Sequence, residues 1–277
     1  MYFGYIINFV IFFGGNQKMR KIISIILALT LLALPACLMS CGGDDNTLTM
    51  ATNASFPPYE YVEGGEIVGI DAEIAAAIAD KLGMELEIID TEFGSIIGGV
   101  QSGKYDMGMA GMTVTEERLE SVNFSKTYAK GVQVIIVKED SGYTSIDDFY
   151  NEDGSVKKDL MIGVQQDTTG HIYASDTVEN GGFGEDHVTS YKTGNDAVQA
   201  LVSGKATCVI IDNEPAKSYV AANKGLKILD TTYVEEDYAI AIAKDNEELL
   251  ADINEALDAL IKDGTVQKII DKYIPAE

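Results

Sequence analysis

The arginine at position 118 is the residue best suited to bind an anion. The only other arginine, Arg20, lies in the charged start of an apolar N-terminal segment. A guanidinium grips a carboxylate with two parallel hydrogen bonds, which an ammonium does not do. The sequence therefore predicts that Arg118 holds the carboxylate of a small captured molecule. The alternative is a surface ion pair with Glu116 or Glu117, worth about 0 to 1 kcal/mol.

An acidic residue is placed to bind the opposite charge. Asp212 follows the apolar run Cys208–Ile211 and precedes Pro215, so it lies where a buried strand reaches the surface. A carboxylate at such a point must be paired or solvated. Its plainer alternative is to cap the helix that begins near Pro215. With Arg118 across a cleft, Asp212 completes a pair of clamps for the carboxylate and the ammonium of an α-amino acid.

A threonine-containing loop offers further donors. Residues 165–170 follow the predicted strand Met161–Val164 and open a helix. The backbone amides of this loop and the hydroxyls of Thr168 and Thr169 can therefore meet an anion. A threonine at a helix start is more often a plain cap, so both readings stay open.

Three residues that follow strands of the first half are candidates for the same site. Thr113 has a backbone N–H for a carboxylate and a hydroxyl for an ammonium. Phe56 and Phe93 each follow a strand, where an aromatic side chain is either a pocket wall or a part of the core.

A repeated pattern is expected to bring these loops together. From Leu48 onward, apolar strands alternate with helices, which indicates crossover units and mostly parallel sheets. The stretches 97–104 and 198–205 match at an offset of 101 residues, each a helix closed by Ser-Gly-Lys before a buried strand. This offset makes Gly111 and Asp212 equivalent, just past the carboxyl ends of strands, where open parallel sheets bind ligands. The first half is predicted to contain strands 48–51, 86–89 and 107–110 and helices 71–82 and 95–102.

The N-terminus has the pattern of an export signal. The 15-residue apolar run Ile22–Ala36 follows Met19-Arg20-Lys21 and is too short to span a membrane comfortably. Residues 1–40 are therefore predicted to be a signal peptide, with Met19 as the true start.

The signal ends in a stretch that resembles the lipobox of bacterial lipoproteins. Cys41, followed by Gly-Gly-Asp-Asp, is the predicted lipid-modified residue, and Cys37 is the weaker alternative. Residues 41–47 would then tether the domain to the outer face of the cell membrane, an extracytoplasmic location.

Charge and composition exclude other classes of function. Residues 1–40 contain three of the 20 basic residues and no acidic residue, so their removal changes the formal charge from −24 to −27. Such a chain would repel nucleic acid. Cys208 is expected to be an inert core thiol. His171 and His187 lack ligand spacing, so we predict no metal site and no cofactor, and we expect a monomer.

Several stretches together resemble the bacterial extracellular solute-binding proteins of family 3, the amino-acid receptors of ATP-driven (ABC) importers. The resemblance runs from Leu48 to Ile274 and is carried by residues 51–60, 69–71, 110–118, 122–125, 163–169 and 262–265. It implies capture of a free amino acid and delivery to the permease subunits of the importer.

The resemblance also implies a set of ligand-binding residues. The α-carboxylate would be bound by Arg118, Thr113 and Thr168 or Thr169. The α-amino group would be bound by Asp212, Gly111 and Thr113. Asn53, Phe56 and Phe93 would border the side-chain pocket, and Ala110 and Gln165, in the matching stretches, complete the set.

The implied fold is α/β, the two-lobed periplasmic-binding-protein-like (type II) fold. Each lobe is a mostly parallel sheet flanked by helices, and the chain crosses between the lobes twice. Lobe 1 would comprise residues 48–130 and 238–277 and lobe 2 residues 134–233, with the hinge at 131–133 and 234–237. Hinge closure around the ligand is the expected mechanism.

Two positions depart from the family pattern and bear on the ligand. Asn53 stands where many binders of basic amino acids and of glutamine have aspartate, which leaves the pocket polar but uncharged at this position. Asp167 replaces a common glycine in the threonine loop. Together with Tyr59 these residues favour a ligand with a polar or basic side chain.

Two other functions are possible on this scaffold. A secreted cyclohexadienyl or arogenate dehydratase-like enzyme would need a general acid in the cleft, such as Glu60 paired with Lys130. A ligand-sensing module of a receptor is disfavoured, because no membrane helix follows in the sequence up to Glu277. We therefore predict a binding protein and not an enzyme.

Overall fold

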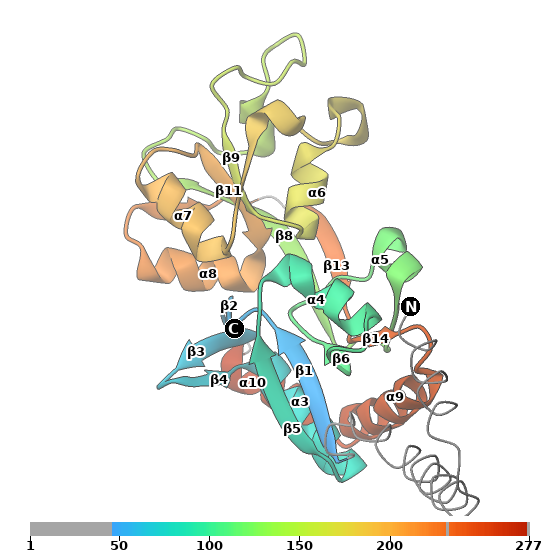
Figure 1. Ribbon diagram of the computed structural model, residues 1–277. Coiled ribbons are helices and arrows are strands. Elements are labelled where there is room, and N and C mark those ends of the chain that lie inside the picture. Colours follow the sequence, from blue (N-terminus) through green and yellow to red (C-terminus); the bar gives the residue numbers. More distant parts are fainter. Residues whose placement is uncertain (1–45, 231–232, 276–277) are drawn as a thin grey trace, which may run out of the picture. The chain divides into compact units, whose positions relative to one another are not determined.

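The computed structural model describes residues 46–230 and 233–275. The first sheet within these residues is mostly parallel. This sheet has the strand order β5 (Glu85–Asp90), β1 (Thr47–Thr52), β6 (Met107–Gly108), β14 (Ala241–Ala243), β7 (Val122–Phe124). Strand β1 runs parallel to β5 and β6, whereas β14 is antiparallel to both of its neighbours. The C-terminal part of the chain therefore returns to complete a sheet that the N-terminal part began (Figure 1).

The helices of this half are α3 (Ile70–Leu82), α4 (Phe93–Gln101), α5 (Glu116–Ser121), α9 (Glu247–Lys262) and α10 (Thr265–Tyr273). Helix α3 buries Ile70, Ile74 and Ile78, spaced four residues apart on one face. Gly83 ends it in the left-handed conformation that glycine adopts without strain. A small antiparallel sheet of β2 (Ser55–Phe56), β3 (Glu60–Glu63) and β4 (Glu66–Val68) precedes α3.

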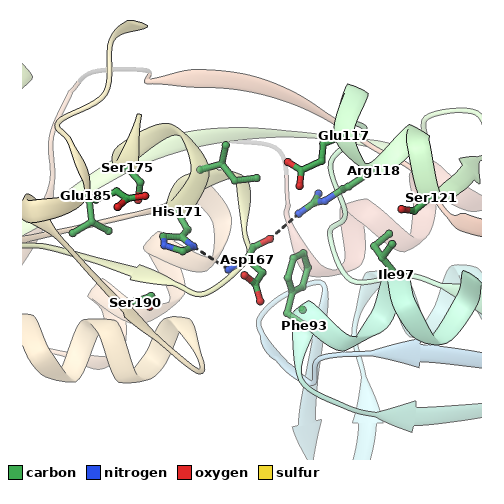
Figure 2. Close-up of a pocket in the computed structure, with 13 residues that line it drawn as sticks. Phe93, Ile97, Glu117, Arg118, Ser121, Asp167, His171, Ser175, Glu185 and Ser190 are labelled. Atoms are coloured by element: carbon green, nitrogen blue, oxygen red, sulfur yellow. Dashed lines mark hydrogen bonds between the residues drawn. The ribbon is translucent and has the colours of Figure 1, made fainter. Parts of the chain in front are cut away.

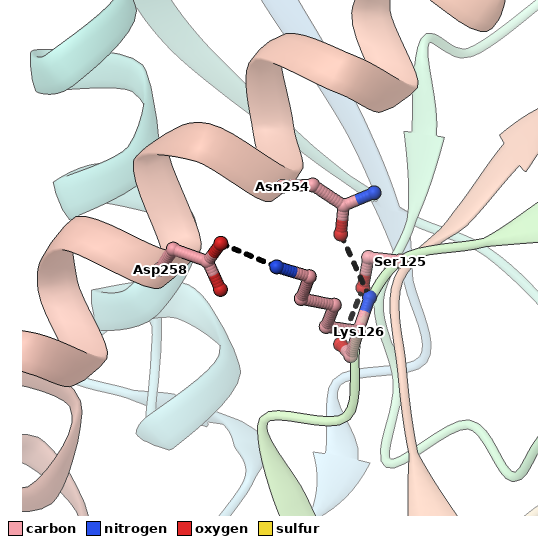
Figure 3. Close-up of polar contacts among 4 residues, drawn as sticks. All are labelled: Ser125, Lys126, Asn254 and Asp258. Carbon is pink, nitrogen blue, oxygen red and sulfur yellow. Dashed lines mark hydrogen bonds and ion pairs between the residues drawn. The ribbon is translucent and has the colours of Figure 1, made fainter.

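Polar contacts hold helix α9 next to the segment that leads into the second sheet (Figure 3). The backbone N–H of Lys126 donates to Oδ1 of Asn254 at 2.8 Å, and the Lys126 ammonium forms an ion pair with Asp258. Ser125 exchanges two hydrogen bonds with the backbone of Ile240, at 2.9 and 3.0 Å. The C-terminal part of the chain is thereby fixed beside the start of the crossover.

The second sheet has the strand order β10 (Val188–Tyr191), β9 (Ile162–Gln165), β11 (Cys208–Asp212), β8 (Ala129–Lys138), β12 (Leu226–Ile228), with β13 (Val234–Tyr238) also paired to β8. Strands β10, β9 and β11 are parallel, and β8 is antiparallel to its partners. The helices of this half are α6 (Thr169–Ser175), α7 (Gly194–Val202), α8 (Asn213–Ala222) and the short 3-10 helices η2 (Ile146–Phe149), η3 (Val178–Asn180) and η4 (Glu185–His187).

The two segments that connect the halves of the molecule are paired with each other. Residues 129–133 of β8 form an antiparallel ladder with β13, from the pair Ala129 and Tyr238 to the pair Gln133 and Val234. These segments include the residues predicted as the hinge. The lobe boundaries and the hinge role themselves stay predictions.

The observed architecture confirms the predicted α/β class with mostly parallel sheets flanked by helices. One predicted strand, 107–110, is shorter than expected, because β6 ends at Gly108 and the chain turns towards the site. Cys208 is buried in the second sheet as expected, and burial raises the pKa of its thiol. The signal peptide, Cys41 and residues 41–45 of the tether lie outside the described residues. Within the described ranges, none of the helices has the length and hydrophobicity needed to cross a membrane.

Candidate functional site

A single pocket is lined by all of the residues that the sequence marked for ligand binding. Its walls come from the ends of β1, β6, β9 and β11, from the segments that follow them, and from the start of α4, which follows β5. The lining residues are Asn53, Phe56, Phe93, Ala110, Gly111, Thr113, Arg118, Gln165, Thr168, Thr169, Asp212 and, in addition, Glu60. The structure therefore brings the predicted residues together, and their roles in binding are proposals taken up below.

Arg118 is held at this pocket by two backbone carbonyl groups. Its Nη1 donates to the carbonyl of Thr113 at 2.7 Å, and its Nη2 donates to that of Asp167 at 3.1 Å (Figure 2). The side chain is 9% exposed, and its guanidinium carbon lies 5.3 Å from the ring centroid of Phe93. Within the described part of the chain, no carboxylate forms an ion pair with Arg118. The alternative of a surface pair with Glu116 or Glu117 is therefore wrong.

Asp212 presents a buried carboxylate to the same pocket. It occupies the N-cap position of α8, but its side chain accepts no hydrogen bond from the amides of that helix. Instead, Oδ2 accepts from Nε2 of Gln133 at 2.8 Å, and Oδ1 accepts from the hydroxyl of Tyr238. The alternative that this carboxylate is a helix cap is therefore wrong.

The crossing strands bring a second carboxylate to Asp212. Glu236 of β13 is 5% exposed, and its Oε2 accepts from the same Nε2 of Gln133 at 2.9 Å. Burial raises the pKa of Asp212 well above its usual range, and the nearby Glu236 carboxylate raises it further. Gln133 and Glu236 lie in the segments that were predicted as the hinge, and no role at the site was predicted for either. The two-residue spacing of Glu236 and Tyr238 on one strand face was the available signal.

A second pair of buried acids comprises Glu60, which lines the pocket, and Asp71. Glu60 is 0% exposed and stands opposite Phe56 in the pairing of β2 and β3. The neighbouring Asp71 accepts from the backbone N–H of Gly111 at 2.8 Å and from the hydroxyl of Tyr128 at 2.9 Å. Burial raises the pKa of Asp71 to about 6 and, with the Asp71 charge as the next cause, raises the pKa of Glu60 well above its usual value.

The pairing of Glu60 with Lys130 does not form. Lys130 is 80% exposed at its side chain, and its Nζ lies 3.9 Å from Oδ1 of Asp237 on the surface. An exposed ammonium on β8 has no access to a fully buried carboxyl group. The acid and base pair considered for a dehydratase is therefore absent from this geometry.

The threonine loop, residues 165–170, both caps a helix and contributes to the pocket wall. Thr168 is the N-cap of α6, where its hydroxyl accepts from the N–H of His171 at 3.3 Å and donates to the carbonyl of Gln165 at 2.8 Å. The plain capping interpretation is thus correct for Thr168, which nevertheless lines the pocket. Gln165 also donates to Oδ1 of Asn53 at 2.9 Å. This bond joins the residue that follows β1 to the last residue of β9.

Asp167 adopts an unusual backbone conformation for its residue type. Its φ is 62°, in the left-handed region that glycine enters without strain. This explains why the family pattern favours glycine here. The Asp167 side chain is exposed and does not line the inner pocket.

A larger hollow adjoins the inner pocket and shares Phe93 and Arg118 with it (Figure 2). The hollow measures about 650 Å³, whereas the cavity inside the inner pocket measures about 20 Å³. The inner cavity has room for about one water molecule. An amino acid therefore enters the inner pocket only when its walls separate.

The buried acids give the ligand-free protein an expected dependence of stability on pH. Asp71 and Glu60 bind protons more tightly in the folded chain than in the unfolded chain, because burial raises the pKa of each. Their stabilising contribution is complete below the unfolded values of about 4 and is lost as the pH rises through the folded values. We expect the free energy of unfolding to fall as the pH rises above about 4, with the Asp71 part lost between about pH 4 and pH 6 and the Glu60 part extending to higher pH.

Urea unfolding of the ligand-free protein at pH 4, 5, 6, 7 and 8 measures this dependence. The variant Asp71→Asn keeps an oxygen that accepts hydrogen bonds but does not titrate. It should remove a part of the pH dependence of about 2 to 3 kcal/mol, most of it between pH 4 and pH 6. Equal slopes in the variant and the unaltered protein would show that Asp71 does not titrate in this range.

The described residues offer no group of three histidine, cysteine, aspartate or glutamate side chains arranged to hold a metal ion. The polar groups of the pocket are instead one guanidinium, carboxyl groups, amides and hydroxyls. Such a set is suited to a small zwitterion or cation.

The chain is similar to known proteins over most of its length. Residues 48–276 match the family described as Bacterial extracellular solute-binding proteins, family 3. The Arginine-binding extracellular protein ArtP of Bacillus subtilis (strain 168) is 33% identical over 251 residues, 88% of this chain and 94% of ArtP.

Solved structures show the same similarity. An ancestral arginine-binding protein bound to arginine is 38% identical with a TM-score of 0.74, covering 83% of this chain and 98% of that chain. The same values of identity and TM-score hold for an ancestral arginine-binding protein bound to glutamine. The ancestral amino acid-binding protein AncCDT-1, a precursor of cyclohexadienyl dehydratase, is 31% identical with a TM-score of 0.73, covering 82% of this chain and 95% of that chain.

Proposed function

The chain belongs to the bacterial extracellular solute-binding proteins of family 3, and from this premise we propose that it captures a free amino acid with a cationic side chain and delivers it to an ABC importer. In this proposal Arg118 binds the α-carboxylate and Asp212 the α-ammonium. The other pocket residues enclose the side chain.

The charge balance of the pocket is the observation that carries the cationic preference. Arg118 offsets a ligand carboxylate, and Asp212 offsets a ligand ammonium. Two further buried carboxyl groups remain, Glu60 in the pocket wall and Glu236 beside Asp212. An unpaired buried charge is costly, so a ligand with an additional positive charge is favoured over a neutral one.

The comparisons support the same ligand class. ArtP and the ancestral protein described above are arginine-binding proteins, and both cover most of this chain. The glutamine-bound ancestral structure makes a neutral polar amino acid the natural competitor in any test.

Capture and release require the pocket to open and close. The inner cavity is too small for an amino acid as the structure stands, and the halves of the site come from the ends of two different sheets. We infer that the paired segments of β8 and β13 act as the hinge and that the importer permease recognises the closed form. Lipidated Cys41 would hold the monomeric protein at the outer face of the membrane.

A thermal-shift panel of free amino acids on the processed chain, residues 41–277, tests the proposed function. Arginine, lysine, ornithine or histidine at one hundred times its dissociation constant should stabilise the protein by about 2.7 kcal/mol. This corresponds to a rise of roughly 5 to 10 °C in melting temperature for a domain of this size. Citrulline, which has the shape of arginine without its positive charge, should produce a smaller rise.

The outcomes separate the ligand class from the function. A larger shift with citrulline or glutamine than with arginine would overturn the cationic preference. The absence of a shift with every amino acid would overturn amino-acid capture itself. Because AncCDT-1 is a precursor of a dehydratase, consumption of prephenate or arogenate by the purified protein should also be measured, and we expect none.

A further inference from the structure

Asp212 and Glu236 form a pair of buried carboxyl groups, of which only Asp212 has a role in the ligand contacts proposed above. Both accept a hydrogen bond from Nε2 of Gln133, at 2.8 and 2.9 Å, so their oxygens lie around one amide group. Both residues are buried, and Oε1 of Glu236 has no hydrogen-bond partner in the described structure. A donor that enters the site therefore finds a free, buried oxygen close to Asp212.

The groups around the pair do not neutralise two negative charges. Tyr238 donates its hydroxyl to Asp212. Neither carboxylate forms an ion pair within the described residues. Several titratable or charged groups act on the pair, and they come from every element packed against it. They are Tyr238 on β13, Tyr173 on α6, Arg118 on α5, Glu60 at the start of β3, and Tyr59, which precedes β3.

Two buried carboxyl groups that share one hydrogen-bond donor do not both ionise without a cation. We propose that Asp212 and Glu236 share one proton in the empty site and that the ammonium of the ligand takes its place, so that binding releases one proton. Glu236 is thereby a positioning residue for the ammonium and helps to balance its positive charge. This inference rests on the proposed function, because it requires an amino acid at the site.

The proton balance of the step is simple. A carboxyl group of the pair loses H⁺ to solvent, and the incoming –NH₃⁺ keeps its three hydrogens and donates to the resulting carboxylates. No bond other than the carboxyl O–H breaks. Since the ligand prefers the ionised pair, its affinity increases with pH throughout the range in which the empty pair still holds its proton. Burial, followed by the Glu236 charge, raises the pKa of Asp212, which extends this range towards neutral pH.

Calorimetric titration of L-arginine into the processed chain, in buffers of different ionisation enthalpy, tests the inference. The slope of observed enthalpy against buffer enthalpy gives the number of protons released. We expect about one proton in the unaltered protein, with affinity rising up to about tenfold per pH unit between pH 5 and pH 7.

Glu236→Gln should abolish the release and flatten the pH profile, because the amide keeps an acceptor for Gln133 but carries no proton to exchange. A matched variant gives the control. Glu235→Gln changes the exposed neighbour on the same strand and should leave both readouts unaltered.

Each result supports or overturns the proposed release of a shared proton. Loss of the proton in Glu236→Gln with binding retained supports the inference, and the melting temperature of that variant reports any structural effect separately. Binding by the unaltered protein with no proton release overturns it, as does a release that persists unchanged in Glu236→Gln. Absence of L-arginine binding in the unaltered protein is a different failure, that of the cationic form of the proposed function.

Discussion

Replacing Arg118 with lysine should weaken the binding of L-arginine by about 100-fold or more. Lysine keeps the positive charge but loses the planar fork that binds a carboxylate with two parallel hydrogen bonds. The two backbone carbonyls that now accept from Arg118, those of Thr113 and Asp167, orient this fork in the pocket. Calorimetric titration of the variant measures the loss. The exposed neighbour Glu116, which lines neither the pocket nor the adjoining hollow, provides the matched control Glu116→Gln.

A ligand without a carboxylate shows whether the loss arises from the proposed contact. Agmatine is arginine without its α-carboxylate, so its weak affinity should be the same for the unaltered protein and for Arg118→Lys. The coupling energy of this double-mutant cycle isolates the contact between guanidinium and carboxylate. An equal loss for arginine and agmatine would assign Arg118 a structural role. The ligand-free melting temperature should change by about 2 to 8 °C, as expected for a cost of 1 to 2 kcal/mol.

Replacing Asp212 with asparagine should also cost about 100-fold or more in affinity for L-arginine. The ammonium loses its charged partner, and a hydrogen bond to a charged group contributes about 1.5 to 3 kcal/mol for each donor involved. At the same time the ligand-free protein should become no less stable at pH 7 to 8. Asparagine removes a buried carboxyl group while it preserves an oxygen that accepts from Tyr238 or Gln133.

The opposed effects on binding and stability distinguish this prediction from a fold defect. The deaminated analogue of arginine, 5-guanidinopentanoic acid, lacks the ammonium and should bind the variant as well as it binds the unaltered protein. Unfolding in urea at pH 7.5 measures the stability of the ligand-free chain. A sharp fall in that stability would indicate that the Asp212 carboxylate holds the end of β11 in place and would contradict a role centred on the ligand.

The class of fold and the position of several pocket residues were predictable from local patterns, and the family resemblance supplied the other members of the pocket. The 101-residue repeat places Gly111 and Asp212 past equivalent strands, and both line the same pocket in the structure. Helix α3 begins within one residue of its predicted start and ends at Gly83, because its apolar spacing and terminal glycine are strong local signals.

The parts that were not predicted depend on contacts between distant segments. Gln133, Glu236 and Asp212 lie on three different strands, and their shared hydrogen bonds have no signature in sequence spacing. The Glu60 and Lys130 pairing was wrong for the same reason, because the sequence gives no indication of which face of β8 carries Lys130. The short length of β6 likewise follows from the turn of the chain towards the site.

The ladder between β8 and β13 limits the ways in which the molecule can move. Five consecutive residue pairs join these strands, from Ala129 with Tyr238 to Gln133 with Val234. Two connecting segments that were not paired with each other would allow one half of the molecule to rotate and to translate relative to the other. In the proposed hinge, a hydrogen-bonded pair of strands would bend or twist as one body. Closure would then follow nearly a single direction of motion, and amino acids of different size would stop it at different points along that path.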